Sequence, residues 1–119
     1  MTPDYIQEYE DFMSKYKLTE VTGEEIGVLI GRMTVYFSRY NLKLVEARKA
    51  LALVSRDIYG QSDATTAKAI TASKAEILAA ATPEAFNYNE AKAHVENLEQ
   101  YIQSMKAVQR GAMFEYAAS

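Results

Sequence analysis

Residues 22–60 read TGEEIGVLIGRMTVYFSRYNLKLVEARKALALVSRDIYG, and no proline interrupts them. Thr22 and Glu25 have the spacing of a capping box, and Gly60 is the next strong break in the chain. The stretch therefore predicts one helix of about 36 residues, which would be roughly 54 Å long. A helix of that length exceeds the width of a small domain, so we expect it to project or to pair with other chains.

The apolar residues of this helix fall on two faces when they are placed at about 100° per residue. The broad face is expected to be core and consists of Ile26, Leu29, Met33, Tyr36, Phe37, Tyr40, Leu44, Ala47, Leu51, Val54 and Ile58. On another face lies a narrow seam of Val28, Val35 and Leu42, with Leu53 close by, which turns basic at Lys49 and Arg56. Because a helix that is apolar on two sides has two partners, Val28, Val35, Leu42 and Leu53 are predicted to form an oligomer interface.

Start and stop signals predict three more helices, and no strand pattern is sustained. An acidic helix over 1–20 opens at Thr2-Pro3 and has the apolar stripe Tyr5, Tyr9, Phe12, Met13 and Tyr16. A short Ala-rich helix is expected over 63–81, from about Ala64. Thr82-Pro83 opens a C-terminal helix over 82–116, whose seam is Ala91, His94, Val95, Leu98, Tyr101, Ile102, Met105, Val108, Ala112 and Met113.

These elements predict a single all-α domain over 1–119. In it a long central helix packs against the N-terminal helix and the long C-terminal helix, and the protein forms a helical oligomer. The chain has no cysteine, its start lacks the pattern of a signal peptide, and no apolar run is long enough to span a bilayer. We therefore expect a soluble, cytoplasmic protein without membrane contact.

The charges are distributed unevenly along the chain. Residues 1–31 carry a net charge of −5, residues 32–60 carry +4 and residues 61–119 carry −2, which together give the formal net charge of −3. A basic block between acidic ones is typical of an anionic partner, or of a complementary face elsewhere in the same protein.

Catalytic and metal-binding patterns are missing from the sequence. His94 is the only histidine, lies on the apolar seam, and has Glu90 as its one convincing carboxylate partner, so we expect it to be a packed residue. The acid pairs Glu24/Glu25 and Glu96/Glu99 lack histidines at ligand spacing and are expected to be solvated. The sequence thus predicts no catalytic residue, no metal site and no cofactor.

The basic side chains of the long helix are the candidate binding residues. Arg32, Arg39 and Lys43 share one angular sector, Lys49 and Arg56 share a second, and Arg48 stands between that pair and the core face. Two interpretations are open. The cations pair with acids of the first and last helices, or they contact the phosphates of nucleic acid, with Tyr59 as a residue for base stacking.

The run EARKALALVSRDIYG at residues 46–60 resembles the helix of the phage recombination mediators of the UvsY type, which has an E-A-x-K-x-x-A-L-x-x-R run and an aromatic-Gly turn. The likeness continues more loosely over residues 30–115. Lys49 and Arg56 match basic positions of the family, whereas Val54 stands where the family pattern has another lysine. The resemblance implies an all-helical oligomer that binds single-stranded DNA.

On this resemblance we expect a non-enzymatic accessory protein of a phage, located in the cytoplasm of the infected bacterial cell. It would help to load a RecA-like recombinase onto single strands covered by single-strand-binding protein. The residues expected to contact DNA are Lys49, Arg56, Arg48, Lys43, Arg39, Arg32 and Tyr59. The alternative is a helical phage adaptor with no nucleic-acid contact, which uses its acidic N-terminal helix and its exposed seams as the interface.

Overall fold

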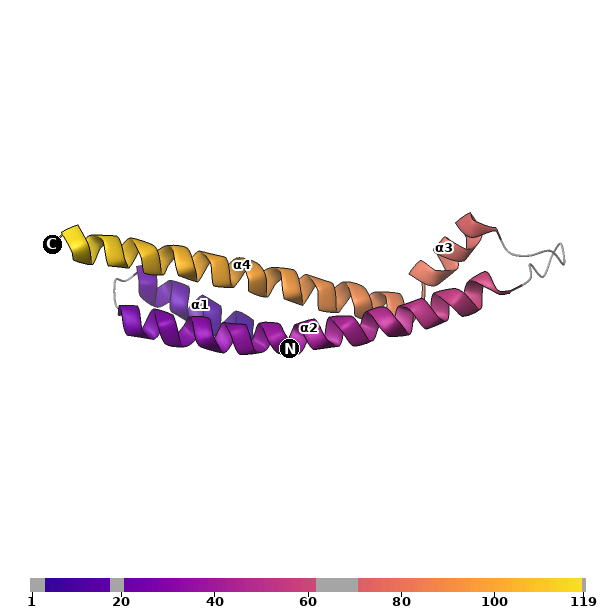
Figure 1. Cartoon of the computed structure of the whole chain (residues 1–119), viewed down its shortest axis with the longest axis horizontal. Helices are drawn as coiled ribbons and strands as arrows, with labels where there is room; N and C mark the ends of the chain where they lie inside the picture. Colours follow the sequence, from indigo (N-terminus) through magenta and orange to yellow (C-terminus); the bar gives the residue numbers. More distant parts are fainter. Residues whose placement is uncertain (1–3, 18–20, 62–70, 119) are drawn as a thin grey trace. The chain divides into compact units, whose positions relative to one another are not determined.

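The chain folds into four helices in a computed structural model, which describes the backbone of residues 4–17, 21–61 and 71–118 and the side chains of 4–16, 21–61 and 71–111. They are α1 (Asp4–Lys17), α2 (Gly23–Tyr59), α3 (Ala72–Ala80) and α4 (Pro83–Ala118) (Figure 1). The described residues include no strand, and α2 packs against α3 and α4. The predicted all-α fold around a long second helix is therefore confirmed.

Threonine side chains cap three of the helices. The hydroxyl of Thr22 accepts a hydrogen bond from the Glu25 amide at 3.2 Å, as the capping-box spacing predicts. The hydroxyl of Thr82 accepts from the Ala85 amide at 3.2 Å and also donates to the Ala79 carbonyl at 2.7 Å, so it closes α3 and opens α4.

The short helix α3 begins later than the sequence predicts. Its N-cap is Thr71, whose hydroxyl accepts a hydrogen bond from the Lys74 amide at 3.3 Å, and its first helical residue is Ala72. Residues 63–70, where the sequence predicts the start of this helix, lie outside the described residues. The same is true of the predicted opening of the first helix at Thr2-Pro3.

The fold contains two compact units, and the boundary between them lies inside α2 and inside α4. Unit 1 consists of Met1–Arg39 and Glu96–Ser119, and unit 2 consists of Tyr40–Val95. Unit 1 thus combines α1 with the first part of α2 and the last part of α4. Unit 2 combines α3 with the remaining parts of the two long helices.

Tyrosine rings link the three helices of unit 1. Tyr5 of α1 is completely buried, and its ring centroid lies 6.0 Å from that of Tyr36 on α2 and 6.0 Å from that of Tyr101 on α4. Tyr9 stacks on Tyr101 with a centroid distance of 3.8 Å and an interplanar angle of 6°. Burial raises the pKa of the Tyr101 hydroxyl above its usual 10.0, and the nearby Tyr9 and Glu10 raise it further.

The core of unit 2 consists of aliphatic side chains. Leu44 and Ile58 of α2, Ala75 of α3, and Ala85 and Ala91 of α4 are all buried. Small alanine side chains on α3 and α4 allow close approach of the neighbouring helices, at the expense of apolar area per residue.

The two predicted faces of α2 differ in burial as expected. Every residue of the broad face is buried or half-buried, with Ile26, Met33, Leu44 and Ile58 the most deeply buried. The narrow seam is exposed, with fractional exposures of 61% for Val28, 51% for Val35, 61% for Leu42 and 55% for Leu53. An oligomer interface therefore remains a prediction, but the residues assigned to it are accessible.

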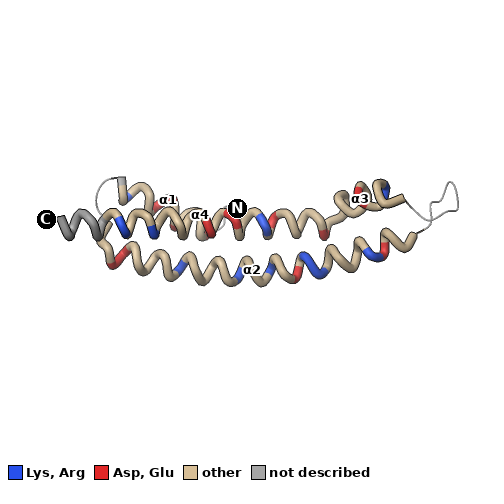
Figure 2. The backbone as a smooth tube through the Cα atoms, turned by 45° about the horizontal axis from the view of Figure 1, so that its top comes forward, with Lys and Arg blue, Asp and Glu red and all other residues tan. Residues whose placement is uncertain are grey.

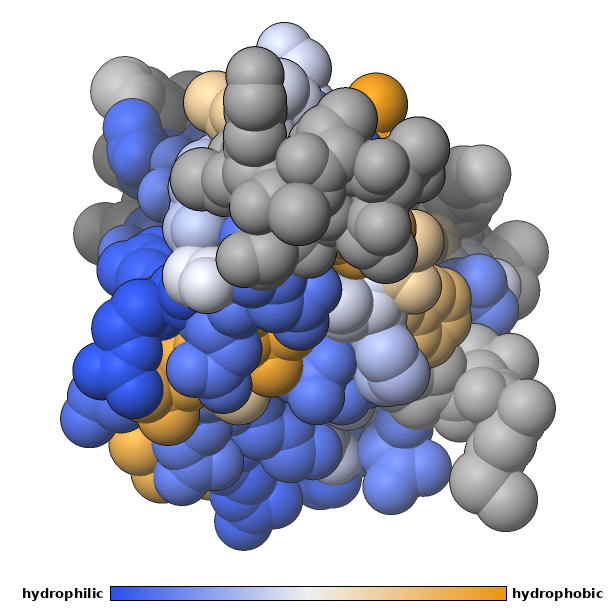
Figure 3. Space-filling model, turned by 90° about the vertical axis from the view of Figure 1, so that its right-hand side faces the viewer, coloured by the Kyte–Doolittle hydropathy of each residue, from blue (hydrophilic) through white to orange (hydrophobic). Residues whose placement is uncertain are grey.

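Single residues depart from the expected stripes. Tyr16, predicted to lie on the buried stripe of α1, is 45% exposed. In unit 2, Ile77 of α3 and Phe86 of α4, which belong to no predicted stripe, are also largely exposed. Figure 3, which faces the right-hand side of Figure 1, shows apolar side chains in orange between hydrophilic ones in blue. The predicted seam residues Ala112 and Met113 lie outside the described side chains.

Candidate nucleic-acid interface and an acidic cleft

The cations of α2 follow one another along the helix with few acids between them (Figure 2). No Asp or Glu occurs between Glu25 and Glu46, whereas Arg32, Arg39 and Lys43 lie in that interval. All seven side chains predicted to contact DNA are exposed. Arg32 and Arg39 belong to unit 1, and the other five belong to unit 2, namely Lys43, Arg48, Lys49, Arg56 and Tyr59.

Arg32 has a carboxylate partner within its own unit. Its guanidinium forms an ion pair and hydrogen bond with Glu8 of α1, while the Arg32 side chain remains 60% exposed. For this residue the geometry matches the intramolecular interpretation, in which cations of α2 pair with acids of the first helix.

Three other cations lie over tyrosine rings. The Lys43 ammonium is 4.9 Å from the ring centroid of Tyr40, and the Arg39 guanidinium carbon is 6.0 Å from that of Tyr36. The Arg48 guanidinium carbon is likewise 6.0 Å from the ring of Tyr88 on α4. Such cation–π contacts at exposed sites stabilise the fold by roughly 0.5–1 kcal/mol and leave the positive charge accessible to an anion.

Lys49 and Arg56 have neither kind of partner. Within the described parts of the chain, no carboxylate forms an ion pair with either side chain and no aromatic ring lies beneath them. The two residues are one seven-residue step apart on α2, so they point in nearly the same direction about 10 Å apart along the helix axis. Two uncompensated positive charges thus lie on one exposed strip of unit 2.

Tyr59 ends α2 beside these charges and is 46% exposed. The amide of the following Gly60 donates to the Arg56 carbonyl at 3.1 Å, which keeps the last turn of the helix closed. A partly exposed ring next to free cations is the arrangement with which proteins stack a base beside a bound phosphate. We define the candidate nucleic-acid interface as Lys49, Arg56 and Tyr59, with Lys43 and Arg48 beside them.

His94 is a packed residue in unit 2. Its ring lies 4.7 Å from that of Tyr40, its side chain is 19% exposed, and its Nε2 is 4.0 Å from Oε1 of Glu90.

Among the described residues, no three His, Asp or Glu side chains lie close enough together to hold a metal ion. Nor does any helix, over its described residues, combine the length and apolar character needed to cross a membrane.

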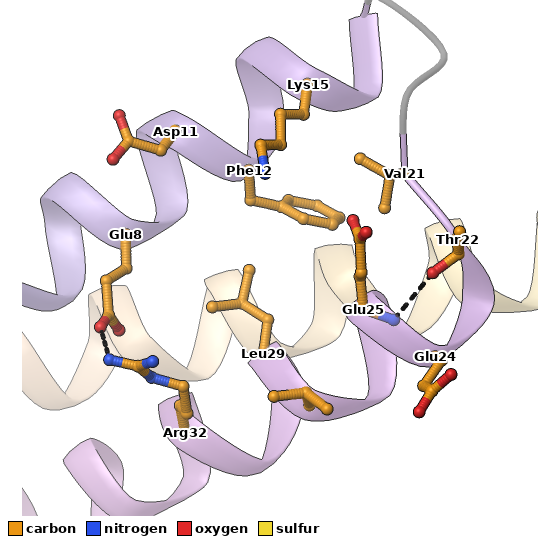
Figure 4. A pocket seen from close by; sticks show the side chains of 11 residues that line it. Glu8, Asp11, Phe12, Lys15, Val21, Thr22, Glu24, Glu25, Leu29 and Arg32 are labelled. Atoms are coloured by element: carbon orange, nitrogen blue, oxygen red, sulfur yellow. Dashed lines mark hydrogen bonds and ion pairs between the residues drawn. The ribbon is translucent and has the colours of Figure 1, made fainter.

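Unit 1 contains a cleft of about 640 Å³ between α1 and the N-terminal part of α2 (Figure 4). Its apolar lining comes from Phe12, Val21, Val28 and Leu29. Four acids and two bases surround this lining, namely Glu8, Asp11, Glu24, Glu25, Lys15 and Arg32. With Arg32 paired to Glu8, the remaining charges are three carboxylates against one ammonium group.

The cleft could not be predicted from the sequence. The net charge of −5 over residues 1–31 indicated an acidic surface in this part of the chain, but not a cleft. Glu8 and Arg32 are 24 positions apart, and only the packing of α1 on α2 brings them together. Figure 4 shows the side chains of Phe12 and Leu29 facing one another from the two helices, with Glu25 beside Phe12.

The chain matches no protein-family model, no curated protein and no solved structure.

Proposed function

We propose that this chain is a non-enzymatic accessory protein that binds single-stranded DNA through the exposed strip of α2 in unit 2 and assists a RecA-like recombinase. The observation that carries the proposal is the pair Lys49 and Arg56, two exposed cations with no ion-pair partner among the described residues. Positive charge of this kind binds a phosphate backbone by displacing its condensed counterions, irrespective of base sequence.

The resemblance of residues 46–60 to recombination mediators of the UvsY type supports the same proposal, because Lys49 and Arg56 occupy the basic positions of that helix. A single chain of net charge −3 offers only a few phosphate contacts. We therefore propose a homo-oligomer that presents several copies of the strip to one strand, since linked sites raise the overall affinity without new contacts. The exposed residues Val28, Val35, Leu42 and Leu53 are the proposed interface.

In this mechanism the oligomer bends or wraps the strand and weakens the hold of single-strand-binding protein. It also offers a surface to the recombinase. The setting proposed for this activity is the cytoplasm of a phage-infected bacterium. Each step is non-covalent and requires no cofactor.

The test is a titration of labelled oligo-dT with the protein at two salt concentrations. In the variant Lys49→Ala/Arg56→Ala we expect weaker binding to unrelated strands by similar factors. The slope of log affinity against log salt should fall by about 1.4 per protomer engaged, because each lost contact to a single strand contributes about 0.7. Circular dichroism should show an unchanged fold, because neither side chain is packed.

The matched control is Lys92→Ala/Lys106→Ala, which removes the same charge from two exposed positions of α4. We expect this control to retain most of the affinity and the full salt slope. Equal losses in the two variants would mean that net charge alone drives binding, and the strip would then have no special role.

The alternative proposal is an adaptor that contacts proteins and no nucleic acid. It is favoured by the acidic cleft of unit 1, whose net negative charge suits a protein partner better than a polyphosphate. Absence of oligonucleotide binding at low salt would leave this alternative in place.

A further inference from the structure

We propose that the cleft of unit 1 is a docking site for a cationic, amphipathic peptide segment of a partner protein. The segment would place an apolar side chain on the lining of the cleft and lysine or arginine side chains against its acidic rim. This inference does not depend on DNA binding, because the cleft and the basic strip of α2 lie in different units.

The apolar lining explains why the partner carries a hydrophobic anchor. Phe12 is 6% exposed, with its ring between α1 and α2 (Figure 4), and Leu29 is half-buried. Val21 also lines the cleft and is half-buried, so the apolar lining extends beyond Phe12 and Leu29. A volume of about 640 Å³ accommodates one or two large apolar side chains of a peptide.

The charges of the rim explain why the partner is basic. Asp11 projects from α1, and Glu24 and Glu25 lie in the first turn of α2, on the opposite side of the cleft. Both glutamates lie at the positive end of the α2 dipole, a position that favours acidic side chains. Lys15 is the single cation left after Arg32 has paired with Glu8.

One acceptor in the cleft lacks a donor. Oε2 of Glu8 is buried and has no hydrogen-bond partner among the described residues, whereas Oε1 is engaged by Arg32. A buried carboxylate oxygen without a partner is costly, and Arg32 satisfies only one of the two oxygens of Glu8.

The same charges disfavour other occupants. A nucleic-acid strand would bring its phosphates against three carboxylates that have no ion-pair partner among the described residues, and an acidic peptide would meet the same repulsion. A purely hydrophilic basic peptide would leave the apolar lining exposed to water, so it would gain only weak, salt-screened charge contacts.

The experiment measures fluorescence anisotropy of three labelled peptides with the full chain. The first is an amphipathic Lys/Leu peptide, the second replaces its lysines with glutamate, and the third replaces its leucines with serine. We expect saturable binding of the Lys/Leu peptide, at least about tenfold tighter than that of either counterpart. Equal binding of the Lys/Ser peptide would overturn the role of the apolar lining.

Two variants test whether the Lys/Leu peptide binds at the cleft. Asp11→Asn/Glu25→Gln removes one charge from each side, and Gln at this position remains compatible with the capping box. Asp11→Lys/Glu25→Lys reverses both charges. We expect affinity for the Lys/Leu peptide to fall about threefold in the first variant and at least tenfold in the second, with oligonucleotide binding unimpaired.

The matched controls are Glu96→Gln/Glu99→Gln and Glu96→Lys/Glu99→Lys, which make the same charge changes at exposed positions of α4 in unit 1. These controls should bind the Lys/Leu peptide within about twofold of the unaltered protein. A loss in the controls as large as in the cleft variants would refute the docking site. A changed oligomeric mass of the cleft variants without peptide would mean that a second copy occupies the cleft, and would also refute it.

Discussion

The cations along α2 have quite different surroundings. Arg32 is held by Glu8, and Lys43 lies over the ring of Tyr40, whereas Lys49 and Arg56 contact neither an acid nor a ring among the described side chains. A count of basic residues would treat all of them alike. The contacts distinguish cations that are paired with an acid or lie over a ring from cations that contact neither.

The raised pKa of Tyr101 makes the free energy of unfolding fall at alkaline pH. Because its pKa is raised in the folded state, the folded chain keeps a proton that the unfolded chain loses above pH 10.0. The resulting stabilisation is fully present below that pH and is lost as the pH rises through the folded-state pKa. In Tyr101→Phe we therefore expect a smaller fall in the free energy of unfolding above pH 10.0, measured by urea denaturation.

Tyr59→Phe is the control for this prediction, because the Tyr59 ring is exposed at the end of α2. It should retain the pH dependence of the unaltered protein. An identical alkaline fall in Tyr101→Phe would show that another group causes it.

At the scale of the helix, the periodicity of apolar residues was a reliable guide. The residues of the broad face of α2, such as Met33 and Ile58, lie inward because burial of the apolar stripe determines how an amphipathic helix rotates. Thr22 and Glu25 located the start of α2 because a cap acts within four residues. The sequence offers several possible caps before α3, from Ser62 to Thr71, so cap residues alone did not identify Thr71 as the N-cap.

Glycine weakens the first part of α2 without a steric need for it. A methyl group added at Gly31 would meet no atom within 4 Å, and the residue is exposed in the middle of the helix. We expect Gly31→Ala to raise the free energy of unfolding by about 0.5–1 kcal/mol, because Ala loses less conformational entropy on folding. Thermal denaturation followed by circular dichroism measures this gain.

Gly60→Ala serves as the comparison, because Gly60 follows the last residue of α2 and its added methyl group would make only an ordinary contact, 3.5 Å from the Arg56 carbonyl oxygen. A smaller gain is expected there, because helix propensity does not act outside the helix. If Gly31→Ala gave no gain either, helix propensity would not limit the stability of α2.

At the scale of the whole molecule, the long-range contacts were beyond the reach of the sequence. The pairing of Glu8 with Arg32 and the contact of Arg48 with Tyr88 depend on how separate helices pack. Helical periodicity gives the direction of a side chain on its own helix but not the residue that faces it. The acidic cleft and the division into two units were missed for the same reason.

The prediction for the whole molecule is that the exposed seam of α2 holds it in an oligomer. Leu42→Glu places a charge in the exposed seam of α2 and leaves the broad buried face unchanged, so helicity should persist while the oligomer dissociates. Light scattering coupled to size-exclusion chromatography measures the mass. Asn41→Glu adds the same charge at the neighbouring exposed position and should leave the mass unaltered. An unchanged mass for Leu42→Glu would exclude the seam as an interface.

The division into two units also has a consequence for the order of folding during synthesis. Unit 2 is one continuous segment, Tyr40–Val95, whereas unit 1 joins Met1–Arg39 to Glu96–Ser119. On the ribosome, the helices of unit 2 can pair as soon as α4 begins to emerge, because their contacts are local in sequence. Tyr5 can meet Tyr36 of α2 early, but its contact with Tyr101 must wait until this part of α4 has emerged, so part of the apolar stripe of α1 stays unburied until then.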